Sequence, residues 1–222
     1  MGAIELTKEQ LQRVAHYLNV KDIIYIDLRM EVFDHIVSDI EAKMGAEKLD
    51  FEPTFYNATV KWNKHLIKES SFYFGLTYSL PKIVLEKAKK VFKKWYFFSL
   101  LLYLIPYILL DNINIIFSEN EIKELNVFLQ TLTVCTLIAF FCLLIVKFKE
   151  KNKTTYSFIL KTLSWNFIIG FFVLFLNYFN KEGDLQKYPI SFLSIFIFTT
   201  YSYFYFYKKH LEAVKKHKTS EG

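Results

Sequence analysis

Four long apolar stretches, separated by short charged segments, constrain this chain more than any other feature of its sequence. The stretches cover about 95–117, 127–146, 162–179 and 189–207. A bilayer core about 30 Å thick needs roughly 20 apolar residues in a helix, and it forces charged residues to the ends of each segment. The sequence therefore predicts an all-α integral membrane protein with a transmembrane domain of four helices over 95–207.

The first stretch is the least regular, because Pro106 lies inside it and Asp111 interrupts it. Residues 95–110 cover only about 24 Å at 1.5 Å per residue, which is short for the hydrocarbon core. Two endings stay open. The helix ends near Leu110, or it continues to Phe117 with Asp111 near the outer headgroups.

Lysines gather on one side of the predicted spans. They precede the first span, separate the second from the third and follow the fourth in a basic tail over 208–222, whereas the other two connections are acidic or balanced. Because cytoplasmic loops carry the excess of Lys and Arg, both termini are expected in the cytoplasm. The first ninety residues also contain no apolar segment typical of a signal peptide. A composition low in Gly and Pro and rich in Lys, Asn, Ile and Phe is typical of an AT-rich bacterial genome, so the expected membrane is the bacterial inner (cytoplasmic) membrane.

Ionisable residues are absent from the depth of the predicted spans, although proton- or ion-coupled transporters and intramembrane proteases normally need them. The polar residues that remain are expected to bond between helices, at about 0.6 kcal/mol each. They include Ser164, Asn166, Asn177, Thr199 and Thr200. Cys135 and Cys142 lie on one predicted helix, too far apart for a disulfide, and are interpreted as packing or lipid-facing residues.

The first 69 residues are more polar and show helical periodicity. Thr7 and Gln10 form a capping-box pattern, which predicts that a helix starts there. A second helix is predicted from about Asp27 to Met44, and Gly45 is well placed to end it in a left-handed cap.

A third helix is predicted to follow Asp50, with Pro53 in its first turn. Together the three helices predict a small cytoplasmic bundle over 1–69. Its core is modest, so this domain is expected to lean on a partner or on the membrane.

The polar face of the second predicted helix carries six acidic or imidazole residues within fifteen positions. They are Asp27, Glu31, Asp34, His35, Asp39 and Glu41. Such a face is usually solvated, but an acidic surface can also dock a basic protein, and these six are the candidate docking residues. Glu31, His35 and Asp39 are spaced as cation ligands, yet one His among carboxylates is a weak metal signature, so no metal or other cofactor is expected.

Residues 5–65 resemble the helical HAAS-type signalling domain of bacteria. The resemblance rests on Leu11–Leu18, Leu28, Glu31, Asp34, His35, Asp39 and Glu41. Members of that family place a short three-helix module before a set of membrane helices, and they are often encoded beside PadR-like transcription regulators. The resemblance implies a signalling role with a PadR-like regulator as the partner. The Leu-Gly-Asp-Pro-like turn common after the third element of that family is missing, and Phe55–Asn63 stand there instead.

Residues 70–94 connect the two parts. Ser70–Leu80 is rich in Phe and Tyr and is predicted to belong to neither the bundle nor a span. After Pro81, apolar residues recur at helical spacing with lysines opposite them, which predicts a basic amphipathic juxtamembrane helix on an anionic leaflet. The candidate headgroup-binding residues are Lys87, Lys89, Lys90, Lys93, Lys94 and Trp95. Nucleic-acid binding is not expected, because no recognition fold precedes these lysines.

The sequence thus favours a membrane-anchored, non-enzymatic adaptor or sensor whose cytoplasmic domain docks a protein partner. The alternative is a small channel or transporter component that works as a homo-oligomer, with Ser, Thr and Asn of the spans lining a pore. A third hypothesis is an enzyme that acts on lipid at the cytoplasmic surface through His35 and Asp39.

Overall fold

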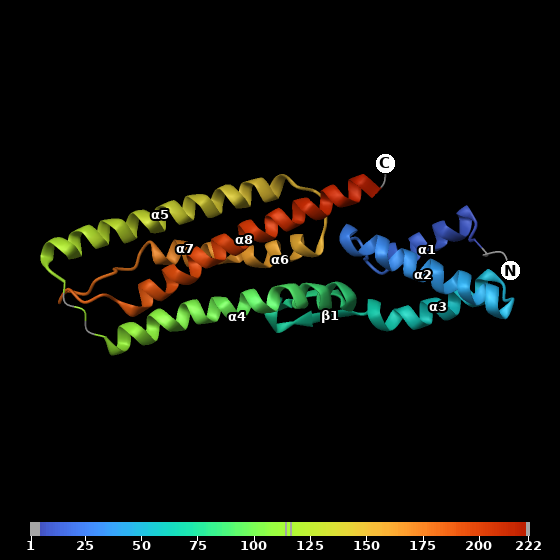
Figure 1. The fold of residues 1–222 in the computed structure, drawn as a ribbon, viewed down its shortest axis with the longest axis horizontal. Coiled ribbons are helices and arrows are strands. Elements are labelled where there is room, and N and C mark those ends of the chain that lie inside the picture. Colours follow the sequence, from blue (N-terminus) through green and yellow to red (C-terminus); the bar gives the residue numbers. More distant parts are fainter. Residues whose placement is uncertain (1–4, 114, 116, 221–222) are drawn as a thin grey trace. The chain divides into compact units, whose positions relative to one another are not determined.

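A computed structural model describes residues 5–113, 115 and 117–220, which are mostly helical (Figure 1). Four helical segments are long and apolar enough to cross a membrane, as the hydropathy pattern predicts. They are Lys82–Asn112, Glu119–Lys149, Thr155–Val173 and Lys187–Thr219.

The described chain divides into two compact units. The first, here called the polar unit, contains the residues up to Lys90, the short segment Asn152–Phe158, and the residues from His210 onward. The second, called the apolar unit, contains Val91–Lys151 and Ile159–Lys209. The segment between the second and third apolar helices therefore belongs with the N-terminal residues, which the sequence did not indicate.

Three amphipathic helices open the polar unit: α1 (Lys8–Val20), α2 (Ile26–Glu47) and α3 (Phe51–Leu66). The predicted capping box at the start of α1 is confirmed, with the Thr7 amide donating to Gln10 Oε1 at 2.8 Å and the Gln10 amide donating to Thr7 Oγ1 at 3.4 Å. Helices α1 and α3 both pack on α2, burying residues at helical spacing. The buried side chains include Val14, Leu18, Val32, Ile36, Ile40 and Ala58.

Gly45 does not end α2, so its prediction as a left-handed cap is wrong. The helix runs on to Glu47, and Lys48 takes the left-handed conformation instead, with a φ of 54°. Ala46 and Glu47 are good helix formers, so the helix continues past Gly45. No atom lies within 4 Å of the position that a Cβ atom of residue 45 would take.

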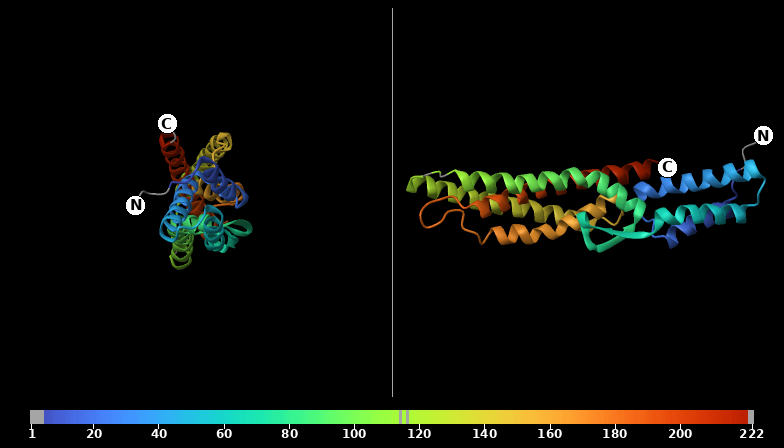
Figure 2. Two further views of the ribbon diagram at one scale, coloured as in Figure 1. Left: turned by 90° about the vertical axis from the view of Figure 1, so that its right-hand side faces the viewer. Right: turned by 90° about the horizontal axis from the view of Figure 1, so that it is seen from below.

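A β-hairpin follows α3, where no regular structure was predicted. Strand β1 (Lys68–Ser71) pairs antiparallel with β2 (Gly75–Pro81), and the 3₁₀ turn η1 (Phe72–Phe74) joins them. Gly75 has a φ of +85°, which favours glycine at the end of this turn. The hairpin lies alongside the first turns of α4 (Figure 2), and it makes the fold mostly helical rather than purely α.

Helix α4 (Lys82–Asn112) is one continuous helix. The predicted juxtamembrane helix and the first span are therefore a single element, and the boundary placed between Lys94 and Trp95 falls within it. Pro106 is accommodated in the helix, which ends at Asn112, between the two endings that the sequence left open.

The other apolar helices extend beyond the ranges predicted for them. Helix α5 (Glu119–Lys149) starts at a capping box between Ser118 and Glu121, which the Ser-x-x-Glu pattern of the sequence encodes. Helix α8 (Lys187–Ser220) includes both the fourth apolar stretch and most of the predicted basic tail.

The third apolar segment begins at Thr155 rather than near residue 162, and it ends at Val173 rather than near residue 179. It consists of α6 (Thr155–Leu163), the 3₁₀ turn η2 (Ser164–Asn166) and α7 (Phe167–Val173). After Val173 the chain leaves the helix, and the hydroxyl of the buried Tyr178 bonds that of Thr133 on α5. Asn177 therefore lies outside the span in which it was predicted.

Aromatic packing holds the apolar unit together. Phe140 of α5 lies 5.2 Å from Tyr203 and 5.7 Å from Phe196 of α8, measured between ring centroids. The Phe196 ring also covers Gly170 of α7, where a side chain would not fit. These contacts join three helices through two fully buried rings of α8.

Candidate functional site

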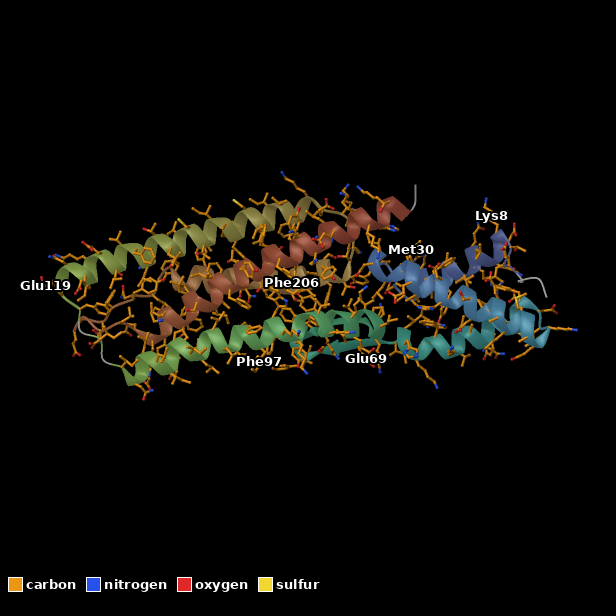
Figure 3. All side chains as sticks on the ribbon, in the orientation of Figure 1. Lys8, Met30, Glu69, Phe97, Glu119 and Phe206 are labelled. Carbon is orange, nitrogen blue, oxygen red and sulfur yellow. The ribbon has the colours of Figure 1, made fainter. Side chains whose placement is uncertain are left out.

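The structure divides the six candidate docking residues of α2 into two groups. Glu31, Asp34 and His35 are exposed, and none of these side chains forms an ion pair or hydrogen bond with another described residue. They share one side of α2 with the exposed Met30 and Ser38, at spacings of one, four, five and eight residues. We call these five residues the α2 ridge; Figure 3 labels Met30, whose exposed fraction is 42%.

The remaining three carboxylates bond within the protein. Lys61 Nζ donates to Asp39 Oδ2 at 2.8 Å, and the amide of Leu6 donates to Glu41 Oε1 at 3.0 Å. Asp27 is the most buried of the three, with a side chain 8% exposed. Each of these three carboxylates therefore has a partner within the protein, and of the six candidate docking residues Glu31, Asp34 and His35 belong to the α2 ridge.

The pKa of Asp39 should depend on its ion pair with Lys61. The hydrogen bond from Lys61 lowers the pKa of Asp39 below its usual 3.8. We expect Lys61→Met to raise that pKa toward 3.8, as followed by carboxyl-carbon NMR. A lowered folded-state pKa stabilises the fold above the unfolded-state pKa, so Lys61→Met should cost about 0.2–1 kcal/mol at neutral pH, the range of exposed pairs. This cost should disappear as the pH falls through the lowered pKa, and a constant cost down to pH 2 would contradict the assignment.

Asp27 forms a joint between α2 and two other segments of the polar unit. Its Oδ1 accepts a hydrogen bond from the amide of Thr155 at 2.8 Å, at the first residue of α6. Lys87 Nζ lies 3.2 Å from the Oδ2 of Asp27 and donates to its backbone oxygen at 2.8 Å. At the residue before Asp27, the amide of Ile26 donates to the carbonyl of Lys153 at 2.9 Å. We call these contacts the Asp27 joint.

A buried polar cluster adjoins the joint along the chain. Thr154 and Ser157 cap α6 reciprocally, with each backbone amide 3.0 Å from the other's hydroxyl. The Thr154 hydroxyl also lies 2.9 Å from Nδ1 of His210. His210 is fully buried. No local sequence pattern indicates this pairing across 56 positions.

The candidate headgroup-binding residues of α4 also separate. Lys87 belongs to the Asp27 joint, so its ammonium group is already paired. The Trp95 ring packs against α8, 4.6 Å from the Tyr205 centroid and 5.3 Å from that of Phe206. Lys90, Lys93 and Lys94 are exposed and Lys89 is half-buried. Four lysines of the predicted set therefore remain candidates for binding lipid headgroups.

In the part of the chain that the structure describes, no three His, Cys, Asp or Glu residues gather as metal ligands would. A cavity of about 300 Å³ lies in the apolar unit between the end of α4 and the start of α8. The charged side chains that line this cavity bond to one another or to a neighbouring amide. Lys187 pairs with Asp111, and Asn180 Nδ2 donates to Asp184 Oδ2 at 2.9 Å. This cavity shows no unmatched group that would bind a charged ligand.

Comparisons with known proteins found no matching family model, no matching curated protein and no matching solved structure. The resemblance to HAAS-type domains therefore stays a prediction. The features of the chain that bear on its function are the α2 ridge, the Asp27 joint and the distribution of charge along the sequence.

Proposed function

We propose that this chain is a membrane-anchored, non-enzymatic adaptor or sensor. Its four apolar helices cross a bacterial cytoplasmic membrane with both termini in the cytoplasm, as the lysine distribution favours. Helices α1, α2 and α3 form a cytoplasmic three-helix domain, and the α2 ridge docks a protein partner. The single observation that carries this proposal is the ridge itself. There Glu31, Asp34 and His35 are exposed and have no partner among the described residues, while their acidic neighbours bond internally.

The chemistry of the ridge defines the partner. Two carboxylates beside an exposed Met30 suit a surface that presents Lys or Arg around an apolar spot. Complementary charges of this kind speed association and select among partners. A PadR-like transcription regulator is the partner class that the HAAS resemblance implies.

The Asp27 joint explains how a docked partner and the membrane helices would influence each other. The ridge and Asp27 lie on the same helix, and Asp27 bonds the first residue of α6 and a lysine in the second turn of α4. A partner that holds α2 therefore acts on the cytoplasmic beginnings of two apolar helices. In an adaptor, the Asp27 joint would hold the docked partner at a fixed position relative to the beginnings of α4 and α6. In a sensor, it would pass a conformational change between those helices and α2.

A crosslinking experiment in native membranes tests the docking function. A photoreactive amino acid replaces Ser38 on the ridge, and in a second protein it replaces Tyr56, which is 68% exposed on α3. We expect Ser38 to capture a cytoplasmic protein and Glu31→Lys with Asp34→Lys to reduce that product at least about tenfold, because the charge of the ridge is reversed.

A matched control separates docking from net charge. Glu5→Lys with Glu47→Lys makes the same change in charge at two exposed positions outside the ridge, and this variant should keep the Ser38 product. Equal capture from Tyr56, or equal loss in the control variant, would reject the ridge as the docking site. Purified PadR-like regulator then tests the partner class, and no binding to it would reject that class alone.

The channel alternative gains no specific support from the spans. The hydroxyls of Thr133, Thr136 and Thr200 each donate to the carbonyl four residues earlier in the same helix, at 2.7–2.9 Å. Ser194 and Ser202 do the same. These hydroxyls satisfy their own helices, so we do not assign them to a pore lining.

A further inference from the structure

The tip of the β-hairpin exposes two large apolar side chains. Phe72 is 76% exposed and Leu76 is 73% exposed, on either side of the buried Phe74. Exposed apolar residues that stand alone are ordinary, but two on one tight turn form a small apolar knob. We call Phe72 and Leu76 the hairpin knob.

The buried side of the hairpin places this knob near the beginning of an apolar helix. The ring centroid of Phe74 lies 5.0 Å from that of Phe158, and the centroid of Tyr78 lies 6.0 Å from it. Phe158 is in the first turn of α6, and the segment that is apolar enough to span a membrane starts at Thr155. The hairpin therefore packs where the third span begins, and all these residues belong to the polar unit.

The hairpin is polar at its base and apolar at its tip. At the base, Lys82 pairs with Glu69 at 3.2 Å, and Lys68 pairs with Asp22; Figure 3 labels Glu69 there. The exposed Lys90 and the half-buried Lys89 follow on α4, beside which the hairpin lies (Figure 2). An apolar tip with cationic side chains nearby suits the boundary between headgroups and acyl chains of an anionic leaflet.

We propose that the hairpin is an interfacial anchor, with Phe72 and Leu76 inserted into the cytoplasmic leaflet of the bilayer. The occupant of the knob is membrane lipid, because the knob adjoins the start of a span and lysines accompany it. The anchor fixes the hairpin, and with it the first turns of α4 and α6, at a constant depth. This inference rests on the proposed membrane topology but is independent of the α2 ridge and its partner.

A fluorescent label that senses polarity tests the anchor in the full-length protein, reconstituted in vesicles of phosphatidylethanolamine and phosphatidylglycerol. Cys135→Ser and Cys142→Ser remove the native thiols, and Phe72→Cys or Leu76→Cys supplies a single site for the label. Tyr56→Cys is the matched control, since Tyr56 is 68% exposed in the same unit and lies on α3. A protein that keeps only Cys135, which is exposed on α5, provides the reference for a membrane span.

We expect nitroxide lipids labelled near the headgroup to quench the label at Phe72 and Leu76, and aqueous iodide to quench it at least about threefold less than at Tyr56. Nitroxides carried deep on the acyl chains should quench the label at Cys135, which lies near the middle of α5. Iodide quenching at Phe72 equal to that at Tyr56 would overturn the anchor while Cys135 still reports a span.

A label at Phe72 that neither iodide nor nitroxide lipid reaches would also overturn the proposal, because a protein surface would then cover the knob. Absence of nitroxide quenching at Cys135 as well would reject the membrane topology together with the anchor. In detergent micelles the folded state of each variant is checked by its helical circular dichroism signal.

Discussion

Lys87→Met should destabilise the polar unit by about 3 kcal/mol, because it leaves the carboxylate of Asp27 buried without its cation. The side chain of Asp27 is 8% exposed and that of Lys87 is 31% exposed, so water can reach the lysine but hardly reaches the acid. Removing the lysine is therefore the more damaging change. Asp27→Asn should cost less, since the amide oxygen can still accept from the Thr155 backbone and Lys87 can turn to solvent.

Hydrogen exchange measured by mass spectrometry on the full-length protein in nanodiscs reports this effect locally. Peptides over residues 152–158 should exchange faster in Lys87→Met by about a hundredfold, which corresponds to roughly 3 kcal/mol. The double variant Asp27→Asn with Lys87→Met should exchange more slowly than Lys87→Met alone, because no buried charge remains.

Lys90→Met is the control for the loss of a lysine. Lys90 is exposed on the same helix and has no partner among the described residues, so its removal should change the exchange of residues 152–158 little. If Lys87→Met and Lys90→Met gave equal exchange rates, Asp27 would not depend on Lys87, and the Asp27 joint would lose its role.

Local patterns in the sequence predicted the elements well. The Thr7 capping box fixed the start of α1, and the periodicity after Asp27 located α2. The hydropathy of the four stretches located four helices long enough to span. These features depend on residues within one or two turns of each other, which is why a single sequence displays them.

Features that depend on distant residues were missed. Asp27 and Thr155 are 128 positions apart, so nothing near Asp27 shows that this acid bonds internally while Glu31 stays exposed. The third apolar stretch was predicted to start near residue 162, directly after Lys161. The helix itself begins at Thr155, where the Thr154 hydroxyl accepts from the Ser157 amide. No local pattern predicts the hairpin, because its strands are short and mostly exposed and its ring contact with Phe158 comes from a distant part of the sequence.

The two helical glycines, Gly170 and Gly45, should respond to alanine in opposite ways. At Gly170 on α7, a Cβ atom would lie closer to the Phe196 ring than van der Waals contact allows. Phe196 is 1% exposed and packs edge-on against Phe140 at 5.7 Å, so it has little room to move. We expect Gly170→Ala to destabilise the apolar unit by about 1–3 kcal/mol through overpacking.

Gly45 on α2 supplies the matched control for Gly170→Ala, because no atom lies within 4 Å of the position that its Cβ would take. Gly45→Ala should stabilise the polar unit by about 0.5–1 kcal/mol, the usual gain for alanine inside a helix. Thermal unfolding in detergent, followed by circular dichroism and by hydrogen exchange of each unit, distinguishes the two effects. Phe196→Leu should lower the stability of the Gly170→Ala protein less than it lowers that of the wild type. The smaller leucine side chain relieves the close contact with the Cβ atom of residue 170. Wild-type stability of Gly170→Ala, or strictly additive effects in the double variant, would show that α7 and α8 do not meet through this glycine.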